Sequence, residues 1–183
     1  MMRISKLLCK SFALLSLLFI ACSNTDDIQQ KVTEIDASQL KVRDPFIFYD
    51  ADTDYYYLHV NGTLKVKSYK SKDLLTWQEN GYSFLPSAGF WGKEDFWAPD
   101  FYKYKDKYYL FITLSAPGVK RGTSVLVSDR VTGTFQPLVN APVTPQEWTC
   151  LDGSLYVDSE GIPWIFYCRE WVEVGDGEIY IQQ

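Results

Sequence analysis

Residues 44–60 read DPFIFYDADTDYYYLHV, an acid and a proline followed by two aromatic-rich runs that a polar turn separates. The same device returns in DFYKYKDKYYLFIT at residues 100–113 and in DGSLYVDSEGIPWIFYC at residues 152–168. The three leading acids are 56 and 52 residues apart. Self-similarity with a period near fifty residues is typical of repeat folds, so we expect stacked or radially arranged sheets, each opening with an Asp-headed hairpin.

The remainder of each unit predicts a second strand pair. After about Val42 the chain alternates Tyr-, Phe- and Val-rich runs with turn signals and shows no sustained helical periodicity, which indicates an all-β fold. The segments at residues 63–80 and 123–139 each place a turn and then an aromatic residue, Trp77 or Phe135, after a Ser-containing strand. Four strands in about 54 residues form the blade of a β-propeller, whose innermost strand lines a central channel.

The number of units is too small to close a ring. Residues 42–183 hold roughly 2.6 units, whereas propellers close with about four to eight blades. The segment GEIYIQQ at residues 177–183 matches the start of the third unit's second strand pair. We therefore expect two and a half to three blades, the N-terminal part of a longer protein.

The first 22 residues are typical of an export signal. Basic residues precede an apolar run of about eleven residues, which is too short to span a bilayer, and the run ends in FIAC at residues 19–22. This resembles a bacterial lipoprotein signal, in which Cys22 is lipidated and becomes the mature N-terminus. We expect residues 23–41 to be a flexible tether, and the protein to be an exported lipoprotein of the outer membrane or cell surface, held to the membrane by its lipid anchor.

The charge of the chain and its cysteine content limit the classes of partner and of metal site that we expect. A formal charge of −5 and a pI near 4.9 argue against a nucleic-acid partner, because phosphate binding needs clustered Lys and Arg. Cys150 and Cys168 flank one predicted hairpin in an oxidising compartment, so a disulfide between them is a hypothesis. No cysteine spacing resembles a zinc site, and a single His, His59, gives no metal cluster and fits a structural role.

Three motifs carry a family resemblance. VRDPFIFYD at residues 42–50, DFWAPDFYKYKDKYYLF at residues 95–111 and CLDGSLYVDSEGIPWIFY at residues 150–167 resemble the first three blades of glycoside hydrolase family 43. Its members are five-bladed β-propellers that cleave arabinose-, xylose- or galactofuranose-containing glycans. The resemblance covers the chain after the tether, and it is specific because three motifs occur in the family's order and spacing.

The resemblance implies roles for individual residues. Asp44 matches the family's general base, and Asp152 matches the acid that orients the catalytic partner and tunes its pKa. Asp100, in the Trp-Ala-Pro-acid motif, matches a position of the substrate pocket. Arg43 beside the base and Trp97 before the pocket acid are further candidates for substrate contact, since a flat ring can stack on a sugar.

The family's general acid, a Glu that opens the next blade, has no counterpart. Glu170 and Glu173 lie in the predicted loop REWVEVGDG at residues 169–177, and Glu178 starts the outer strand pair. In an inverting glycosidase the base activates water, while an acid about 6.5 to 9.5 Å away protonates the departing oxygen. We therefore expect an inverting glycosidase that ends before its acid.

Two other readings stay open. One is a non-catalytic carbohydrate-binding propeller or an inactive remnant, in which the same acids hydrogen-bond sugar hydroxyls. The other is a different five-bladed glycosidase family, which Arg-Asp-Pro at Asp44 disfavours. The substrate is an oligo- or polysaccharide of unspecified sugar and linkage. No cofactor is required, and a structural calcium, known in the family, has no assignable ligands here. Mid-strand aromatics are expected in the core: Trp77, Tyr56, Tyr109 and Phe166.

Overall fold

The computed structural model describes residues 33–183, which form one compact unit. The predicted signal, Cys22 and the first part of the predicted tether lie outside the described residues. No helix among residues 33–183 is long and apolar enough to cross a bilayer. The account below concerns this unit alone.

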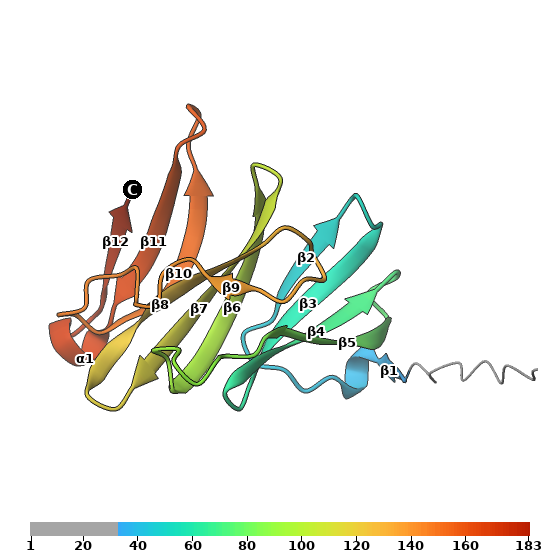
Figure 1. Ribbon diagram of the computed structural model, residues 1–183, viewed down its shortest axis with the longest axis horizontal. Coiled ribbons are helices and arrows are strands. Elements are labelled where there is room, and N and C mark those ends of the chain that lie inside the picture. Colours follow the sequence, from blue (N-terminus) through green and yellow to red (C-terminus); the bar gives the residue numbers. More distant parts are fainter. Residues whose placement is uncertain (1–32) are drawn as a thin grey trace, which may run out of the picture. The chain divides into compact units, whose positions relative to one another are not determined.

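The unit consists of three antiparallel sheets, which Figure 1 shows side by side in chain order. The first sheet has the order β1-β5-β4-β3-β2, with β1 Glu34–Asp36, β2 Phe46–Asp50, β3 Tyr55–Gly62, β4 Lys65–Ser71 and β5 Thr76–Phe84. The second has the order β6-β7-β8-β9, with β6 Glu94–Tyr104, β7 Lys107–Ala116, β8 Val119–Ser128 and β9 Gln136–Pro137. The third has the order β10-β11-β12, with β10 Cys150–Val157, β11 Pro163–Arg169 and β12 Glu178–Gln182.

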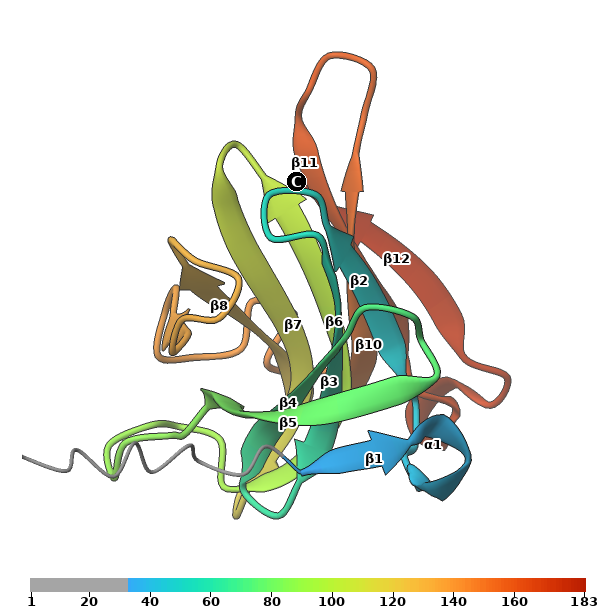
Figure 2. The same cartoon turned by 90° about the vertical axis from the view of Figure 1, so that its right-hand side faces the viewer.

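This architecture confirms the all-β prediction and the strand order within each unit. The Asp-headed hairpins are β2–β3, β6–β7 and β10–β11, and each is continued by the predicted outer strands. β6, the first strand of the middle sheet, contacts β2 on one side and β10 on the other, so the first strands of all three sheets are neighbours (Figure 2). The predicted loop at residues 169–177 differs from expectation, because it contains one helical turn, α1 Trp171–Val174.

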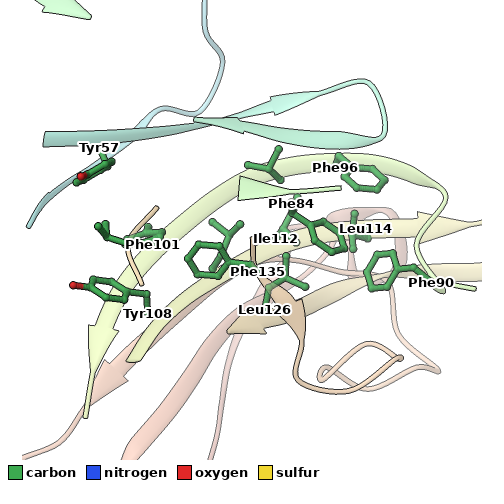
Figure 3. Packing of buried hydrophobic residues seen from close by; sticks show 13 residues of the cluster. Tyr57, Phe84, Phe90, Phe96, Phe101, Tyr108, Ile112, Leu114, Leu126 and Phe135 are labelled. Carbon is green, nitrogen blue, oxygen red and sulfur yellow. The ribbon is translucent and has the colours of Figure 1, made fainter. Parts of the chain in front are cut away.

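The main core lies between the first and second sheets. Figure 3 shows Tyr57 of β3 opposite Phe101 and Tyr108 of the middle sheet, with Phe84 and Phe96 further along the interface. Strand β7 is buried over most of its length, as expected for a strand with a sheet on each side. Its alternating residues Leu110, Ile112 and Leu114 belong to this core, and the predicted core residue Trp77 lies in a second cluster.

That second cluster changes the boundary of the predicted tether. Ile35, Leu40 and Val42 pack against the buried residues Leu58 and Trp77. β1 pairs with β5, and Ala37 N–H donates to Leu75 O at 2.8 Å. The ordered fold therefore begins before Val42, because apolar side chains at residues 35–42 cover an apolar face of the first sheet.

Two expectations about the third hairpin are wrong. Cys150 and Cys168 are free thiols, because Cys150 pairs with Arg169 and Leu151 with Cys168, a register that places the two cysteines on opposite faces. Phe166 is 36% exposed. It pairs with Ile181 of β12, and no further sheet covers this face among the described residues.

His59 is fully buried between the first two sheets. Its ring stacks on Phe101 with 4.2 Å between the ring centroids, and Nδ1 lies 2.6 Å from Ser83 Oγ. Nε2 has no partner among the described residues. Burial lowers the pKa of His59 to about 3, because an imidazolium there would have a second N–H without an acceptor. The predicted structural role of His59 fits these contacts.

The stability of the unit should therefore fall in mild acid. The pKa of His59 is about 3 when folded and near 6.5 when unfolded, so the unfolded chain binds a proton that the folded chain excludes below about pH 6.5. Between pH 7 and pH 4.5 we expect this one group to remove about 2 to 3 kcal/mol from the free energy of unfolding, as measured by urea titration.

His59→Phe is the control, because it keeps a ring against Phe101 but does not titrate, and the chain has no other His. The variant should lose less free energy of unfolding than the wild type over this pH range. Parallel losses in the two proteins would show that His59 is not the acid-sensitive group.

Candidate functional site

The first strands of the sheets share a backbone feature at their heads. Asp44, just before β2, and Asp152, in β10, both adopt left-handed backbone conformations, with φ of 50° and 56°. The matching residue of the middle sheet is Ala98, with φ of 44°. Asp44 and Ala98 are 54 residues apart, and so are Ala98 and Asp152, so the repeat is regular. The equivalence of Asp100 with Asp44 and Asp152, expected from sequence, is therefore wrong, because Asp100 lies two residues beyond the repeated position.

The conformation of Asp152 is fixed by the neighbouring sheet. Its backbone N–H donates to Thr113 Oγ1 of β7 at 2.9 Å. The next residue, Gly153, lies so close to β8 that an added Cβ would be 2.5 Å from both Cγ2 and Oγ1 of Thr123. Left-handed backbone is uncommon outside Gly, Asn and Asp and is concentrated at functional sites when surrounding structure enforces it. The contacts to Thr113 and Thr123 supply that enforcement.

Asp44 is open to solvent. Its side chain is 44% exposed, and Oδ2 lies 3.2 Å from Nε of Arg43, which is itself 70% exposed. The Arg43 guanidinium carbon lies 5.6 Å from the centre of the Trp97 ring, within the range of a cation–π contact. The structure thus brings the predicted base together with two of the predicted substrate contacts.

Asp152 lies in a field of negative charge. The protein walls raise its pKa by partial desolvation even though the residue remains exposed, and the charges of Asp44, Asp100 and Glu170 raise it further. Arg43 acts in the opposite direction. The two carboxylates for which the motifs predict the roles of base and modulator, Asp44 and Asp152, therefore interact electrostatically.

Asp100 occupies a different environment on β6. Burial raises its pKa, while hydrogen bonds from the hydroxyls of Ser154 and Tyr102 oppose this shift. Both hydroxyls donate to Oδ2, at 2.8 Å and 3.1 Å. Within residues 33–183 no hydrogen bond reaches Oδ1, so this atom could accept one from a sugar hydroxyl, as the pocket role expected for Asp100 would require.

Strand β6 is distorted where it carries Trp97. Its pairing with β7 shifts register between Glu94 and Trp97 and again between Trp97 and Asp100. Bulges of this kind redirect side chains next to active sites. Trp97 is half-buried, and a pocket of about 450 Å³ lies beside it, lined by residues 61–64 and 95–97.

Three charged residues near Trp97 have no role in the motif analysis. Arg121 of β8 places its guanidinium carbon 4.4 Å from the Trp97 ring centre, and its Nε donates to Asp95 Oδ2 at 2.9 Å. Its Nη1 donates to Glu170 Oε1. No periodicity marks these residues, because Asp95 of β6, Arg121 of β8 and Glu170 just after β11 are far apart in sequence and meet only in the folded chain.

No glutamate of the third unit is placed as a general acid. Glu170 is 3% exposed at its side chain and is paired with Arg121. A hydrogen bond from Lys120 is the main cause that lowers the pKa of Glu173 to about 2, so this group is ionised at neutral pH. Glu178, on β12, accepts a hydrogen bond from the Tyr180 hydroxyl at 2.6 Å. Within residues 33–183, no cluster of three or more His, Cys, Asp or Glu side chains is arranged to hold a metal ion.

Comparison with known proteins places this geometry in context. Residues 37–183 match the model of Glycosyl hydrolases family 43. The crystal structure of an endo-arabinase from Bacteroides thetaiotaomicron is 60% identical and superposes with a TM-score of 0.79 over 81% of this chain and 52% of that chain. An endo-1,4-beta-xylanase structure from the same species is 26% identical, with a TM-score of 0.64 over 79% of this chain and 47% of that chain.

A relative found by sequence is also a glycosidase. The extracellular exo-alpha-(1->5)-L-arabinofuranosidase ArbA of Cellvibrio japonicus is 25% identical over a 151-residue alignment, which covers 74% of this chain and 42% of that protein. The chain thus spans about half the length of the relatives that it matches. The sheets described here correspond to part of the propeller of such proteins, which confirms the predicted fold class.

The close approach of Gly153 to Thr123 yields a stability prediction. Gly153→Ala should lower the free energy of unfolding by about 1 to 3 kcal/mol, because its Cβ would overlap Thr123. Thr123→Ala removes both atoms that lie at 2.5 Å, so the double variant should recover part of that loss in urea titrations.

Thr123→Ala alone is the control. Its buried hydroxyl has no hydrogen-bond partner among the described residues, so its removal leaves no donor or acceptor unsatisfied. Strictly additive losses in the double variant would mean that the two side chains do not conflict.

Proposed function

Since this chain belongs to the glycosyl hydrolases of family 43, we propose that the protein hydrolyses O-glycosidic bonds of arabinan-type plant glycans with inversion at the anomeric carbon. The similarity to an endo-arabinase and to an exo-alpha-(1->5)-L-arabinofuranosidase supports arabinofuranose as the sugar. The observation that carries the proposal is the pair Asp44 and Asp152, which occupy equivalent left-handed positions in the first and third sheets and interact electrostatically.

In this proposal Asp44 is the general base. Its exposure lets a water molecule reach the carboxylate, and one of its oxygens, Oδ2, is paired with Arg43. The carboxylate takes a proton from that water as the water attacks the anomeric carbon, so the attacking species develops hydroxide character in the transition state. Arg43, Trp97 and Asp100 bind the sugar around this point.

Asp152 acts on the protonation state of the partner acid. A general acid must hold its proton near neutral pH, and a neighbouring negative charge favours this by repulsion. The proposal assigns the acid itself to none of residues 33–183, because Glu170 is held by Arg121 and Glu173 is ionised. Loss of such an acid typically costs about 10² to 10⁴ in rate.

Because Glu170 is paired with Arg121 and Glu173 is ionised, a second candidate function is also favoured. A carbohydrate-binding propeller needs Asp44, Asp100 and Asp152 only as hydrogen-bond acceptors for sugar hydroxyls. Such a protein would bind arabino-oligosaccharides without releasing sugar. Both functions therefore involve binding of arabino-oligosaccharides, and only the enzyme also hydrolyses them.

We further propose that the protein is exported and anchored by a lipid on Cys22. The support is the basic and apolar pattern of residues 1–22, with a small residue before Cys22. ArbA, a relative by sequence, is described as extracellular, which is consistent with export. Its glycan substrate would then be met outside the cytoplasm.

Substitution of the base tests the enzymatic proposal. In the protein as its natural gene encodes it, Asp44→Asn keeps the shape of the side chain but cannot accept a proton, so turnover of linear arabinan should fall by about 10² or more with little loss of folded protein. Initial rates of reducing-sugar release and the urea unfolding midpoint measure the two effects.

Asp129→Asn is the matched control, because Asp129 is exposed and pairs only with Lys107 at the surface. It should leave turnover unchanged. If Asp44→Asn turns over arabinan at the wild-type rate, or loses activity only in step with folded protein, Asp44 is not the base.

The role of Asp152 predicts a shift of the pH profile. The basic limb of kcat reports loss of the general acid's proton, and a nearby negative charge holds that limb at higher pH. Asp152→Asn removes this charge, so the basic limb should move to lower pH and the maximum should fall. A profile of unchanged position would contradict the modulator role.

If Cys22 carries a lipid anchor, the expressed protein should be found in the membrane fraction. Cys22→Ser should move the expressed protein from the membrane fraction to the soluble fraction after cell lysis and ultracentrifugation. Cys9→Ser, within the same signal, is the control and should leave the protein in the membrane fraction. A Cys22→Ser protein that sediments as fully as the wild type would refute the anchor.

A further inference from the structure

We propose that Arg121 is a positioning residue that fixes the Trp97 ring at the mouth of the site by joining two carboxylates from neighbouring sheets. The observation behind this is one guanidinium with three partners: Asp95 on β6, Glu170 after β11, and the ring of Trp97. The part of the proposal that concerns sugar binding rests on the proposed function.

The two carboxylates hold Arg121 in place. Nε donates to Asp95 and Nη1 to Glu170, so two edges of the planar guanidinium are occupied by different acids. The side chains of Arg121, Asp95 and Glu170 are 23%, 18% and 3% exposed, so water competes weakly for these bonds. Asp95 Oδ2 also accepts a hydrogen bond from Ser115 Oγ at 2.6 Å. A lysine could not make both contacts with the same rigid geometry.

The guanidinium of Arg121, held in this way, lies over the ring of Trp97. The 4.4 Å between the guanidinium carbon and the ring centre is shorter than the 5.6 Å of Arg43. Arg43 is 70% exposed, and its ion pair within residues 33–183 is with the exposed Asp44, so it is the less fixed of the two cations. Arg121 therefore holds the ring, and Arg43 is free to contact a bound sugar.

The network also ties Trp97 to the strand pair that carries Asp152. Asp95 and Trp97 lie in the bulged part of β6, where the register of pairing with β7 shifts on both sides of Trp97. Glu170 follows β11, and its backbone N–H donates to Thr149 O, directly before β10, at 2.8 Å. Arg121 thus links the bulge that carries Trp97 to the sheet of Asp152.

The test uses the protein as its natural gene encodes it and begins with a readout that needs no activity. The difference in near-ultraviolet circular dichroism between the wild type and Trp97→Phe isolates the asymmetric environment of Trp97. In an Arg121→Met background this difference should shrink by about half or more. Arg121→Lys retains a charge for Asp95 and Glu170, so it keeps the test usable if Arg121→Met does not fold, and it should shift the signal in the same direction.

The second readout is kinetic. Arg121→Met should raise KM for a linear arabino-oligosaccharide about tenfold with a smaller change in kcat. Adding Trp97→Phe to it should change KM by less than about twofold, because the ring is already displaced. Lys120→Met is the control, since Lys120 is the adjacent cation but pairs with Glu173, and it should leave both readouts as in the wild type.

The two arms separate the possible failures. An unchanged Trp97 difference spectrum in both Arg121 variants overturns the positioning role, whatever the activity. Independent, multiplying effects of Arg121→Met and Trp97→Phe on KM also overturn it. If the wild type releases no sugar from arabinan, the proposed function fails, and the spectral arm still decides the role of Arg121.

Discussion

Burial of strand β7 on both faces is the constraint on which the rest of the structure depends. Leu110, Ile112 and Leu114 pack toward the first sheet, and each is at most 1% exposed. Full burial of such side chains contributes about 1.5 to 3 kcal/mol apiece. On the other face, Thr113 receives the backbone N–H of Asp152. The same strand therefore contacts both neighbouring sheets and helps to set the position of Asp152, so the packing of the sheets and the geometry of the candidate site depend on each other.

The site is built from backbone conformations that an isolated strand would avoid. Asp44 and Asp152 adopt left-handed backbone, and β6 carries two register shifts around Trp97. Side-chain contacts between the sheets compensate for this: Thr113 and Thr123 confine Asp152 and Gly153, and Arg121 joins β6 to the end of β11. Left-handed backbone and register shifts thus occur at the carboxylates and at Trp97, where contacts between the sheets hold them in place.

The parts of this arrangement that follow from local pattern could be predicted from the sequence. Alternating apolar residues and turn signals give the hairpins, and motif resemblance gives Asp44 and Asp152. The sequence pattern aligned Asp100 of the middle unit with Asp44 and Asp152, because all three are acids. The feature that repeats is the left-handed backbone, and in the middle unit it is at Ala98. It also missed Arg121 and its partners, which depend on contacts between strands far apart in sequence. Pairing register, which decides the faces of Cys150 and Cys168, is fixed by the whole sheet and is not readable from one hairpin.

The central claim is that the Asp44 carboxylate accepts the proton of the attacking water. Chemical rescue of Asp44→Ala by azide tests it most directly, because azide attacks an anomeric carbon without needing a base. The account predicts that the variant is slow with water, that added azide restores turnover of an activated arabinofuranoside, and that the product is the glycosyl azide of inverted configuration. A glycosyl azide of retained configuration would contradict the account, since azide would then have displaced another carboxylate from a covalent glycosyl-enzyme, and Asp44 would be the acid/base residue of a retaining enzyme.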